Sequence, residues 1–304
     1  MRQTAFAQEM AMKSSPALSL FLLLLSQAGA QQPAAPAPAS QNPSPMTDTS
    51  RAHGRVAQRE VAGRRWTLSV GTLLLPATAR VRPIMPLYVH FHGAGWLAEL
   101  SATQRDRHAA ILTVQLGAGS TVYQKAFTDP QRFQQLLDEA ARALSPTAPP
   151  RFHPIVISSF SAGYGAVREI LRNHDNWKLI DAIVLADGLH TSYRPEGIPG
   201  PLEEEPLAPF LDFAREAVAG RKQFVITHSE IFPGTFASTT QTTDYLIASL
   251  GLKRQPLLKW GPGGMQQLSE ARAGKLRILG FAGNTAPDHI DHFHGLKQWL
   301  KLVR

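Results

Sequence analysis

PIVISSFSAGYGAVREIL, residues 154–171, begins with the pattern of a strand and ends with that of a helix. Its first half belongs to an apolar run over residues 153–159, which is typical of a strand buried on both faces. Its second half has apolar residues at the i, i+3 and i+4 spacing of a helix: Val167, Ile170 and Leu171. The segment therefore predicts a strand that turns sharply into a helix.

Ser161 stands at the corner of this turn, with the small residues Ser159 and Gly163 two positions to either side. A sharp strand-to-helix turn crowds the chain at those two positions and pushes the corner side chain out over the sheet edge. The first amides of the helix carry partial positive charge, which suits a developing oxyanion. These features indicate a nucleophile elbow with Ser161 as the nucleophile.

Strand-like and helix-like segments alternate along most of the chain. Strands are expected at residues 64–76, 85–95, 109–117, 153–159, 181–187, 222–228 and 275–283, and helices at 130–144, after Ser161, at 239–251 and at the C-terminus. Such alternation predicts an α/β fold, with a mostly parallel central sheet and helices on both of its faces. Ligands bind beyond the carboxyl ends of strands in sheets of this kind.

The N-terminal region is expected to precede the folded domain. Residues 1–30 have the pattern of a signal peptide, with Lys13, an apolar run over 17–25 and a small-residue cleavage site ending at Ala30. Residues 31–54, rich in proline and alanine, predict a disordered linker. The folded domain is expected at 55–304. These features predict a secreted or periplasmic protein with no stable membrane span once the signal is cleaved; an uncleaved anchor is the alternative.

Composition narrows the classes of function. The formal net charge of +8 admits acidic partners, but no Lys/Arg cluster with interleaved aromatic residues and no zinc-finger spacing occurs, so we expect no nucleic-acid partner. The chain has no cysteine, which excludes disulfides, a thiolate nucleophile and cysteine-ligated metals. We expect no cofactor.

The quoted corner also supports a resemblance to a known family. The run from Ser159 to Gly163 resembles the small-x-Ser-x-small elbow of the α/β-hydrolase superfamily, and HFHGAG, residues 90–95, resembles the His-Gly segment after the family's third strand. The resemblance covers residues 60–304 as strand order. It implies a secreted, esterase- or lipase-like serine hydrolase whose oxyanion hole is made by the amides of Ala162 and Ala94, with Gly95 as the alternative to Ala94.

The family order of triad residues is serine, acid, histidine, which places the general base near the C-terminus. GNTAPDHIDHFHGL, residues 283–296, offers three histidines after the last strand. His289 lies directly beyond the strand, His292 one helical turn further on and His294 on a different face of the helix. We expect His289 to be the base, with His292 and then His294 as alternatives.

The acid is expected to be Asp187, which ends the strand after the serine strand. A carboxylate there would hold the tautomer of the histidine. Most family members carry the acid one strand later, where this chain offers Glu230 as the alternative. The resemblance also implies a small cap in the excursion from Gly188 to Gly220.

Several other residues are assigned to substrate binding or support. His92, Gly93, Tyr164, His190 and His228 are the predicted substrate-binding residues. One of His90 and His92 is expected to form a hydrogen bond that holds the loop carrying the oxyanion amides. His228 is expected to support the loop that carries the acid.

The predicted function is hydrolysis of a small-molecule or polymeric carboxylic ester through an acyl-enzyme intermediate, with a Ser161–Asp187–His289 triad. Ester cleavage is favoured over peptide cleavage by the resemblance alone. One alternative is a metal-dependent hydrolase, because His289, Asp291, His292 and His294 lie close together in the sequence. The other is a non-catalytic binding protein on a hydrolase scaffold.

Overall fold

The computed structural model describes residues 51–303 of the chain. The expected signal peptide, residues 1–30, and residues 31–50 of the expected linker lie outside the described residues. Residues 51–54 were also assigned to the linker, yet the side chain of Arg51 contacts two carboxylates near the C-terminus, at Asp288 and Asp291. The domain's contacts therefore begin earlier in the chain than the composition predicted.

Within residues 51–303, the strands form one sheet in the order β1-β2-β4-β3-β5-β6-β7-β10-β9-β8. The central strands β4, β3, β5, β6, β7 and β10 are parallel, and antiparallel strands flank them at both edges. Their bounds are β1 Gly63–Thr67, β2 Thr72–Pro76, β3 Ile84–Phe91, β4 Ala110–Val114, β5 Arg151–Phe160, β6 Ala182–Ala186, β7 Gln223–His228, β8 Gln255–Trp260, β9 Gln266–Ala273 and β10 Leu276–Phe281.

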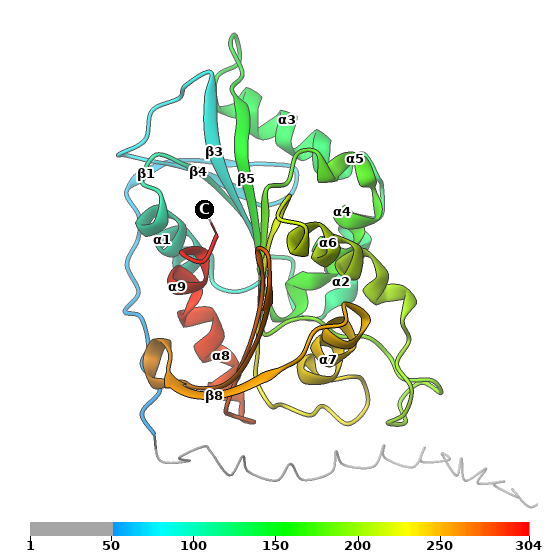
Figure 1. Ribbon diagram of the computed structural model, residues 1–304. Coiled ribbons are helices and arrows are strands. Elements are labelled where there is room, and N and C mark those ends of the chain that lie inside the picture. Colours follow the sequence, from blue (N-terminus) through cyan, green and yellow to red (C-terminus); the bar gives the residue numbers. More distant parts are fainter. Residues whose placement is uncertain (1–50, 304) are drawn as a thin grey trace, which may run out of the picture. The chain divides into compact units, whose positions relative to one another are not determined.

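Helices cover both faces of the sheet, as the alternation predicted (Figure 1). Seen edge-on, α1, α8 and α9 lie on one side of the strands, and α2 to α7 lie on the other. The bounds are α1 Gly95–Arg105, α2 Ser120–Ala126, α3 Arg132–Leu144, α4 Tyr164–Arg172, α5 His174–Trp177, α6 Ala208–Val218, α7 Thr239–Ser249, α8 Ala286–His294 and α9 Leu296–Leu300. The expected fold class is therefore confirmed.

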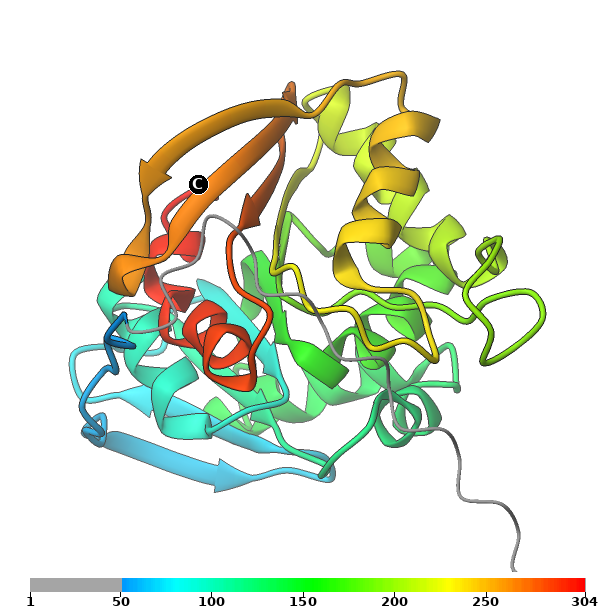
Figure 2. The same ribbon diagram turned by 90° about the horizontal axis from the view of Figure 1, so that it is seen from below.

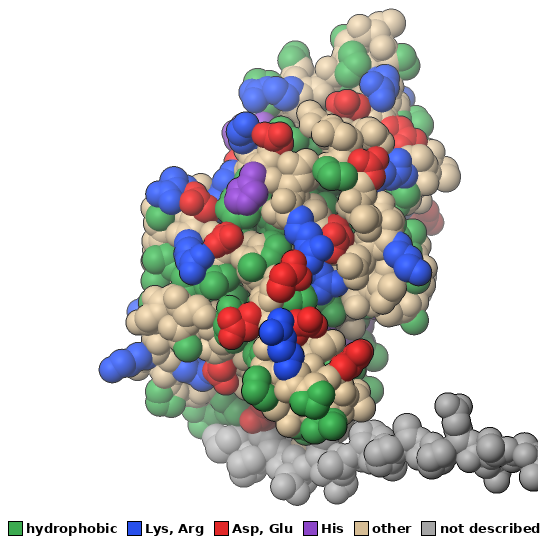
Figure 3. Space-filling model, turned by 90° about the vertical axis from the view of Figure 1, so that its right-hand side faces the viewer, with side chains coloured by type: hydrophobic (Ala, Val, Ile, Leu, Met, Phe, Trp, Pro, Cys, Tyr) green, Lys and Arg blue, Asp and Glu red, His purple; other side chains and the backbone are tan. Residues whose placement is uncertain are grey.

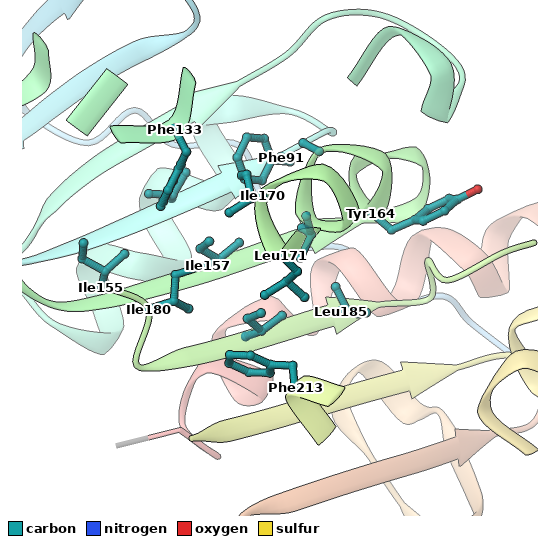
Figure 4. Packing of buried hydrophobic residues seen from close by; sticks show 14 of the residues in the cluster. Phe91, Phe133, Ile155, Ile157, Tyr164, Ile170, Leu171, Ile180, Leu185 and Phe213 are labelled. Atoms are coloured by element: carbon teal, nitrogen blue, oxygen red, sulfur yellow. The ribbon is translucent and has the colours of Figure 1, made fainter. Parts of the chain in front are cut away.

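Two hydrophobic clusters, one on each face, explain why the central strands are apolar throughout. Along β5, Ile157 belongs to the cluster under α3, α4 and α6, whereas its neighbour Val156 belongs to the cluster under α1 and α9. Successive side chains of a strand point to opposite faces, so both must be apolar. Figure 4 shows Ile170 and Leu171 of α4 packed beside Ile157.

The antiparallel edge made of β8 and β9 was not predicted. Three alternate residues of β9 are buried, Gln267, Ser269 and Ala271, and the first two of them are polar. The apolar alternation that marks a half-buried strand is therefore missing from the sequence. Figure 2 shows these two strands at the rim of the sheet, beyond β10.

The expected C-terminal helix is divided into α8 and α9 at Gly295. A Cβ atom at Gly295 would lie 2.8 Å from the indole ring of Trp299, so this close approach requires glycine. The break turns α9 toward α1, whose residue Leu97 shares a buried cluster with Leu296 and Trp299.

The excursion over residues 188–220 is only partly a cap. Its second half is α6, whose Phe210 and Phe213 are fully buried in the core. The first half, residues 188–207, is closed by a bridge between Tyr193 and Leu202. This first half supplies many of the residues that line the large cavity described below.

Charged side chains of both signs are interspersed on the side of the protein that carries α3 to α7 (Figure 3). No helix of residues 51–303 combines the length and the apolar composition needed to cross a membrane.

Candidate active site

Ser161 follows β5 directly and begins the short turn that leads into α4. Its backbone is left-handed, with φ at 46°. A Cβ atom at Gly163 would collide with the carbonyl of Phe91, and one at Gly188 would collide with the backbone of Ser161 itself. The small residue after the corner is therefore required by the neighbouring strand β3. Gly188 was not singled out in the sequence, because its contact with Ser161 exists only in the folded chain.

Backbone strain is concentrated at the carboxyl ends of three neighbouring strands. Within residues 51–303, the non-glycine residues with positive φ are His92, Ser161 and Asp187, which follow β3, β5 and β6. A left-handed conformation costs a non-glycine residue of the order of 1 kcal/mol, and such residues cluster at functional sites. The strain therefore marks this edge of the sheet as the candidate site.

His289 lies in the first turns of α8 and contacts Asp187. The side chains of Thr285 and Asp288 form a capping box at the start of the helix, which sets the direction in which α8 leaves β10. His289 Nδ1 lies 2.7 Å from Asp187 Oδ2. The imidazole side chain remains 26% exposed and also packs against the ring of Phe160. Its Nε2 edge is thus left for a partner in the site.

Asp187 is almost completely buried and is surrounded by donors. It accepts hydrogen bonds from the Ser229 amide at 2.8 Å, the Ser229 hydroxyl at 2.7 Å and the Thr239 hydroxyl at 2.9 Å. Burial alone would raise the pKa of this carboxyl, but the nearby His292 ring and the hydrogen bonds from His289 and Ser229 outweigh it. The pKa of Asp187 is held well below its usual range, so the group is a carboxylate at neutral pH.

Glu230, the alternative acid, has different partners. Its carboxylate accepts a hydrogen bond from the Gly283 amide at 3.2 Å, and its own amide donates to the Gly283 carbonyl at 2.8 Å. Glu230 thus ties the chain after β7 to the chain after β10. The carboxylate that meets His289 is that of Asp187.

The other two C-terminal histidines point elsewhere. His292 is buried, and its Nδ1 lies 2.8 Å from the hydroxyl of Thr227. His294 accepts a hydrogen bond from the Val56 amide at 2.9 Å. The three histidines that are close in the sequence therefore do not converge on one point, as a metal site built from them would require.

Asp291, the remaining member of that sequence cluster, belongs to an ion-pair network. Asp288, Asp291 and His53 lie close enough together to hold a cation. The two carboxylates are, however, paired with Arg51, and Asp291 also pairs with Arg55. Their negative charge is already matched by side chains of the chain itself.

The loop after β3, which resembles an oxyanion loop, is fixed by three hydrogen bonds. The His90 ring nitrogen Nε2 lies 2.7 Å from the His92 carbonyl, the His92 amide donates to Val114, and the Gly93 amide donates to Gln115. His90 is thus the residue that braces the loop. Burial lowers the pKa of His90 to about 3, so its ring is neutral and Nε2 can donate to the carbonyl.

Two cavities meet at Ser161. The smaller, of about 340 Å³, is lined by Ser161, Asp187 and His289 together with apolar side chains. The larger, of about 870 Å³, is lined by Ser161, Ala162 and Tyr164 together with many polar side chains. The three predicted triad residues therefore share one cavity wall.

The predicted substrate-binding residues are only partly brought together. His190 lines both cavities, and Tyr164 lines the larger one. His92, Gly93 and Ala94 line neither cavity, although the His92 ring stacks on Phe160 next to His289. The amide of Ala94 as an oxyanion donor remains a prediction.

His228 faces away from both cavities and braces the chain after β7. Its Nε2 accepts from the Arg254 guanidinium at 2.8 Å, and its Nδ1 lies 3.1 Å from the Ser229 carbonyl. Burial and the charge of Arg254 lower the pKa of His228 to about 4. These contacts support the bracing role expected for His228, because the adjacent Ser229 in turn holds Asp187.

The buried neutral histidines predict a stability that falls with acidity. The unfolded chain binds protons at a histidine pKa near 6.5, whereas folded His90 and His228 bind them only near 3 and 4. Between those values the unfolded state binds more protons, so the free energy of unfolding decreases as the pH falls. We expect each histidine to contribute a loss of about 2 kcal/mol between pH 7 and pH 5, measured by urea unfolding.

His174, which is not buried, provides the control for this prediction. The variant H174Q should lose the same stability on acidification as the wild type, whereas H228Q should lose about 2 kcal/mol less. Equal losses in all three proteins would contradict the assignment to buried histidines.

The chain has partial structural similarity to several solved hydrolases. The chain resembles an acylaminoacyl peptidase of Pyrococcus horikoshii with 16% identity and a TM-score of 0.44, over 79% of this chain and 40% of that one. It resembles an esterase of Pyrobaculum calidifontis with 11% identity and a TM-score of 0.43, over 80% and 85%. Carboxyl esterase 2 of Tuber melanosporum matches with 15% identity and a TM-score of 0.41, over 86% and 90%.

The chain thus spans less than half of the peptidase's length. No protein-family model and no curated protein matches the sequence. At these identities and TM-scores, the similarities establish neither the fold nor the activity of this chain. The family features of this chain rest on its own architecture: a mostly parallel sheet covered on both faces, and a strained serine at the corner between β5 and α4. By that architecture, the chain has an α/β fold whose serine corner resembles the nucleophile elbow of the α/β-hydrolase superfamily.

Proposed function

We propose that the protein is a serine hydrolase that cleaves carboxylic esters through an acyl-enzyme. The observation that carries this proposal is the 2.7 Å contact between His289 Nδ1 and the buried carboxylate of Asp187, in a cavity that Ser161 also lines. A serine needs a base to remove its proton, and the base needs an acceptor that fixes its tautomer. The contact supports His289 as the proposed base and Asp187 as the proposed acceptor.

In the proposed reaction, Ser161 Oγ attacks the ester carbonyl while His289 Nε2 accepts its proton. The amides of Ala162 and Ala94 would stabilise the oxyanion that forms on the carbonyl oxygen. When the ester C–O bond breaks, His289 returns the proton to the departing alcohol. Water then attacks the acyl-enzyme by the same route and releases the acid and free Ser161. Asp187 stays ionised throughout and stabilises the imidazolium.

Two further points belong to the proposal. The preference for esters over amides rests on the resemblance of the elbow and the HFHGAG segment to esterases and lipases of this fold. Export from the cytoplasm rests on the signal-peptide pattern of residues 1–30.

A fluorescent fluorophosphonate probe tests the nucleophile directly. We expect the wild-type protein to be labelled and the variant S161A to remain unlabelled, because the probe bonds only to an activated serine. The matched control is S120A, which removes another serine hydroxyl from the wall of the larger cavity and should leave labelling intact. A wild type that stays unlabelled would contradict the proposal and favour a metal-dependent or purely binding role. Equal labelling of wild type and S161A would place the reactive serine elsewhere.

A further inference from the structure

The two cavities that meet at Ser161 differ in chemistry, and this difference bears on the substrate of the proposed hydrolase. The smaller cavity has the apolar side chains Ile231, Pro233, Phe236 and Ala286 on its walls, next to His289. The larger cavity is lined mostly by hydroxyl, amide and charged side chains; it shares Phe236 with the smaller cavity, and His289 is absent from its lining.

The position of His289 decides which part of an ester each cavity would receive. The imidazole returns its proton to the oxygen of the departing alcohol, so the alcohol must lie beside His289. The alcohol portion therefore belongs in the smaller, apolar cavity. The acyl portion extends in the other direction from Ser161, into the larger polar cavity.

Arg168 is the charged side chain best placed to recognise that acyl portion. It lies seven residues after Ser161 and one helical turn after Tyr164, the first residue of α4. Its side chain is only 10% exposed, and its guanidinium lies over the ring of Tyr164, 5.6 Å from the ring centre. Both residues line the larger cavity. Tyr164 itself is at the margin of the core, with its hydroxyl directed away from the buried cluster (Figure 4).

The hydrogen-bonding capacity of Arg168 is mostly unused. Within residues 51–303, its one hydrogen bond runs from Nη2 to the neutral amide oxygen of Gln124, at 3.0 Å. Its buried Nε makes no hydrogen bond there, but it is ion-paired with the buried carboxylate of Glu169 at 3.5 Å. A guanidinium has five N–H donors in a planar fork that matches a carboxylate. Arg168 thus offers donors to a ligand in the cavity.

Arg172, the neighbouring arginine in the lining, is already paired. Its Nη2 donates to both carboxylate oxygens of Glu205, at 2.9 and 3.0 Å, and its Nη1 lies 3.5 Å from Glu169. Glu169 therefore divides its single charge between the two arginines. Arg172 is not available to a ligand in the way that Arg168 is.

Acidic side chains in the lining oppose an anionic ligand less strongly than Arg168 favours it. Three acidic side chains line the cavity: Glu196 and Glu205 are exposed to solvent, Glu203 is half-buried, and Glu205 is already paired with Arg172. Water and salt screen the interactions of exposed charges. A buried guanidinium interacts with an anion more strongly, because the medium around it has a lower dielectric constant. The interior of the cavity next to Arg168 therefore favours an anion.

We propose that the larger cavity binds an acyl group that ends in a carboxylate, which Arg168 holds while Ser161 attacks the ester at the other end. The substrates are then monoesters of dicarboxylic acids with small apolar alcohols. This inference rests on the proposed serine-hydrolase function and adds the chemical class of its substrate.

The test compares kcat/KM for matched pairs of substrates. The first member of each pair is the monoethyl ester of a straight-chain dicarboxylic acid, from succinic to sebacic acid, and the second is the ethyl ester of the methyl-ended acid of equal length. We expect wild type to prefer the charged ester by about 30-fold at the best chain length, because a charge-assisted hydrogen bond is gained. R168Q should abolish this preference by lowering kcat/KM for the charged ester toward that for the neutral ester.

S120A is the control in the same cavity and should keep the preference, because it removes an uncharged hydroxyl from the lining and leaves the charged side chains intact. R168K should restore part of the preference lost in R168Q, because it keeps the charge but not the planar fork. A further measurement uses the wild-type protein alone. Adipate and suberate should inhibit hydrolysis of the charged esters competitively, whereas the corresponding diamides should not inhibit it.

The outcomes separate this inference from the function on which it rests. Hydrolysis of the neutral esters without preference for the charged ones would overturn the role of Arg168 and leave the hydrolase intact. An equal loss of both activities in R168Q, without rescue in R168K, would mean a structural role and would also overturn it. Absence of fluorophosphonate labelling and of hydrolysis of every ester would overturn both.

Discussion

The variant D187N is expected to lower kcat for ester hydrolysis by about 10⁴-fold, while the protein remains folded. The carboxylate of Asp187 accepts from His289 Nδ1 and from three other donors. An amide has one oxygen to accept with, and its NH₂ group would face the imidazole. His289 would then turn into the tautomer that carries its proton on Nε2 and could not accept one from Ser161.

Glu230 provides the matched control for this prediction, because it is the other acidic candidate at the same sheet edge. E230Q should reduce kcat by less than tenfold, since the Glu230 carboxylate contacts Gly283 and not His289. Urea unfolding of each variant would show that the comparison concerns folded protein. A large loss in E230Q together with near-normal turnover in D187N would exchange the roles of the two acids.

The double variant R51Q/R55Q is expected to lower the free energy of unfolding by about 3 kcal/mol. The side chains of Asp288 and Asp291 are only 4% and 1% exposed, and Arg51 pairs with both of them. Arg55 pairs with Asp291 from the same segment. Removing the arginines would leave buried carboxylates without their main counter-charges, which costs more than the loss of an exposed ion pair.

The exposed Arg59 provides the control for this second prediction. R59Q should change the free energy of unfolding by less than about 0.5 kcal/mol, as is usual for substitutions on the surface. Because His289 lies between the two carboxylates on α8, the double variant should also lose esterase activity at a lower urea concentration than wild type. Unfolding curves that coincide for wild type and the double variant would show that residues 51–55 contribute nothing to holding α8.

The main elements of the fold and the position of Ser161 could be predicted from the sequence because their signals are local. A parallel strand buried on both faces must be apolar at every position, and the helix after it must repeat its apolar residues every three to four positions. β5 and α4 follow these rules on either side of Ser161. The small residue at Gly163 could also be predicted from the elbow pattern, although the contact that requires it is with the Phe91 carbonyl of β3.

Other parts depended on contacts between residues far apart in the chain. Whether Asp187 or Glu230 meets the histidine follows from how β6, β7 and α8 pack, and both acids satisfy the local pattern equally well. The separate surroundings of His289, His292 and His294 follow from the direction of α8. β9 was missed because its buried positions Gln267 and Ser269 are polar.

The sequence by itself therefore determined the α/β class, the serine corner and the small set of residues from which a base and an acid could come. The tertiary structure decided which of them are in contact, that residues 51–55 hold α8, and that Arg168 lies in a cavity wall with most of its donors unused. The physical reason is the same in each case. Backbone propensity and hydrophobic periodicity act over a few neighbouring residues, whereas hydrogen bonds and ion pairs between side chains are set by the packing of elements distant in the chain.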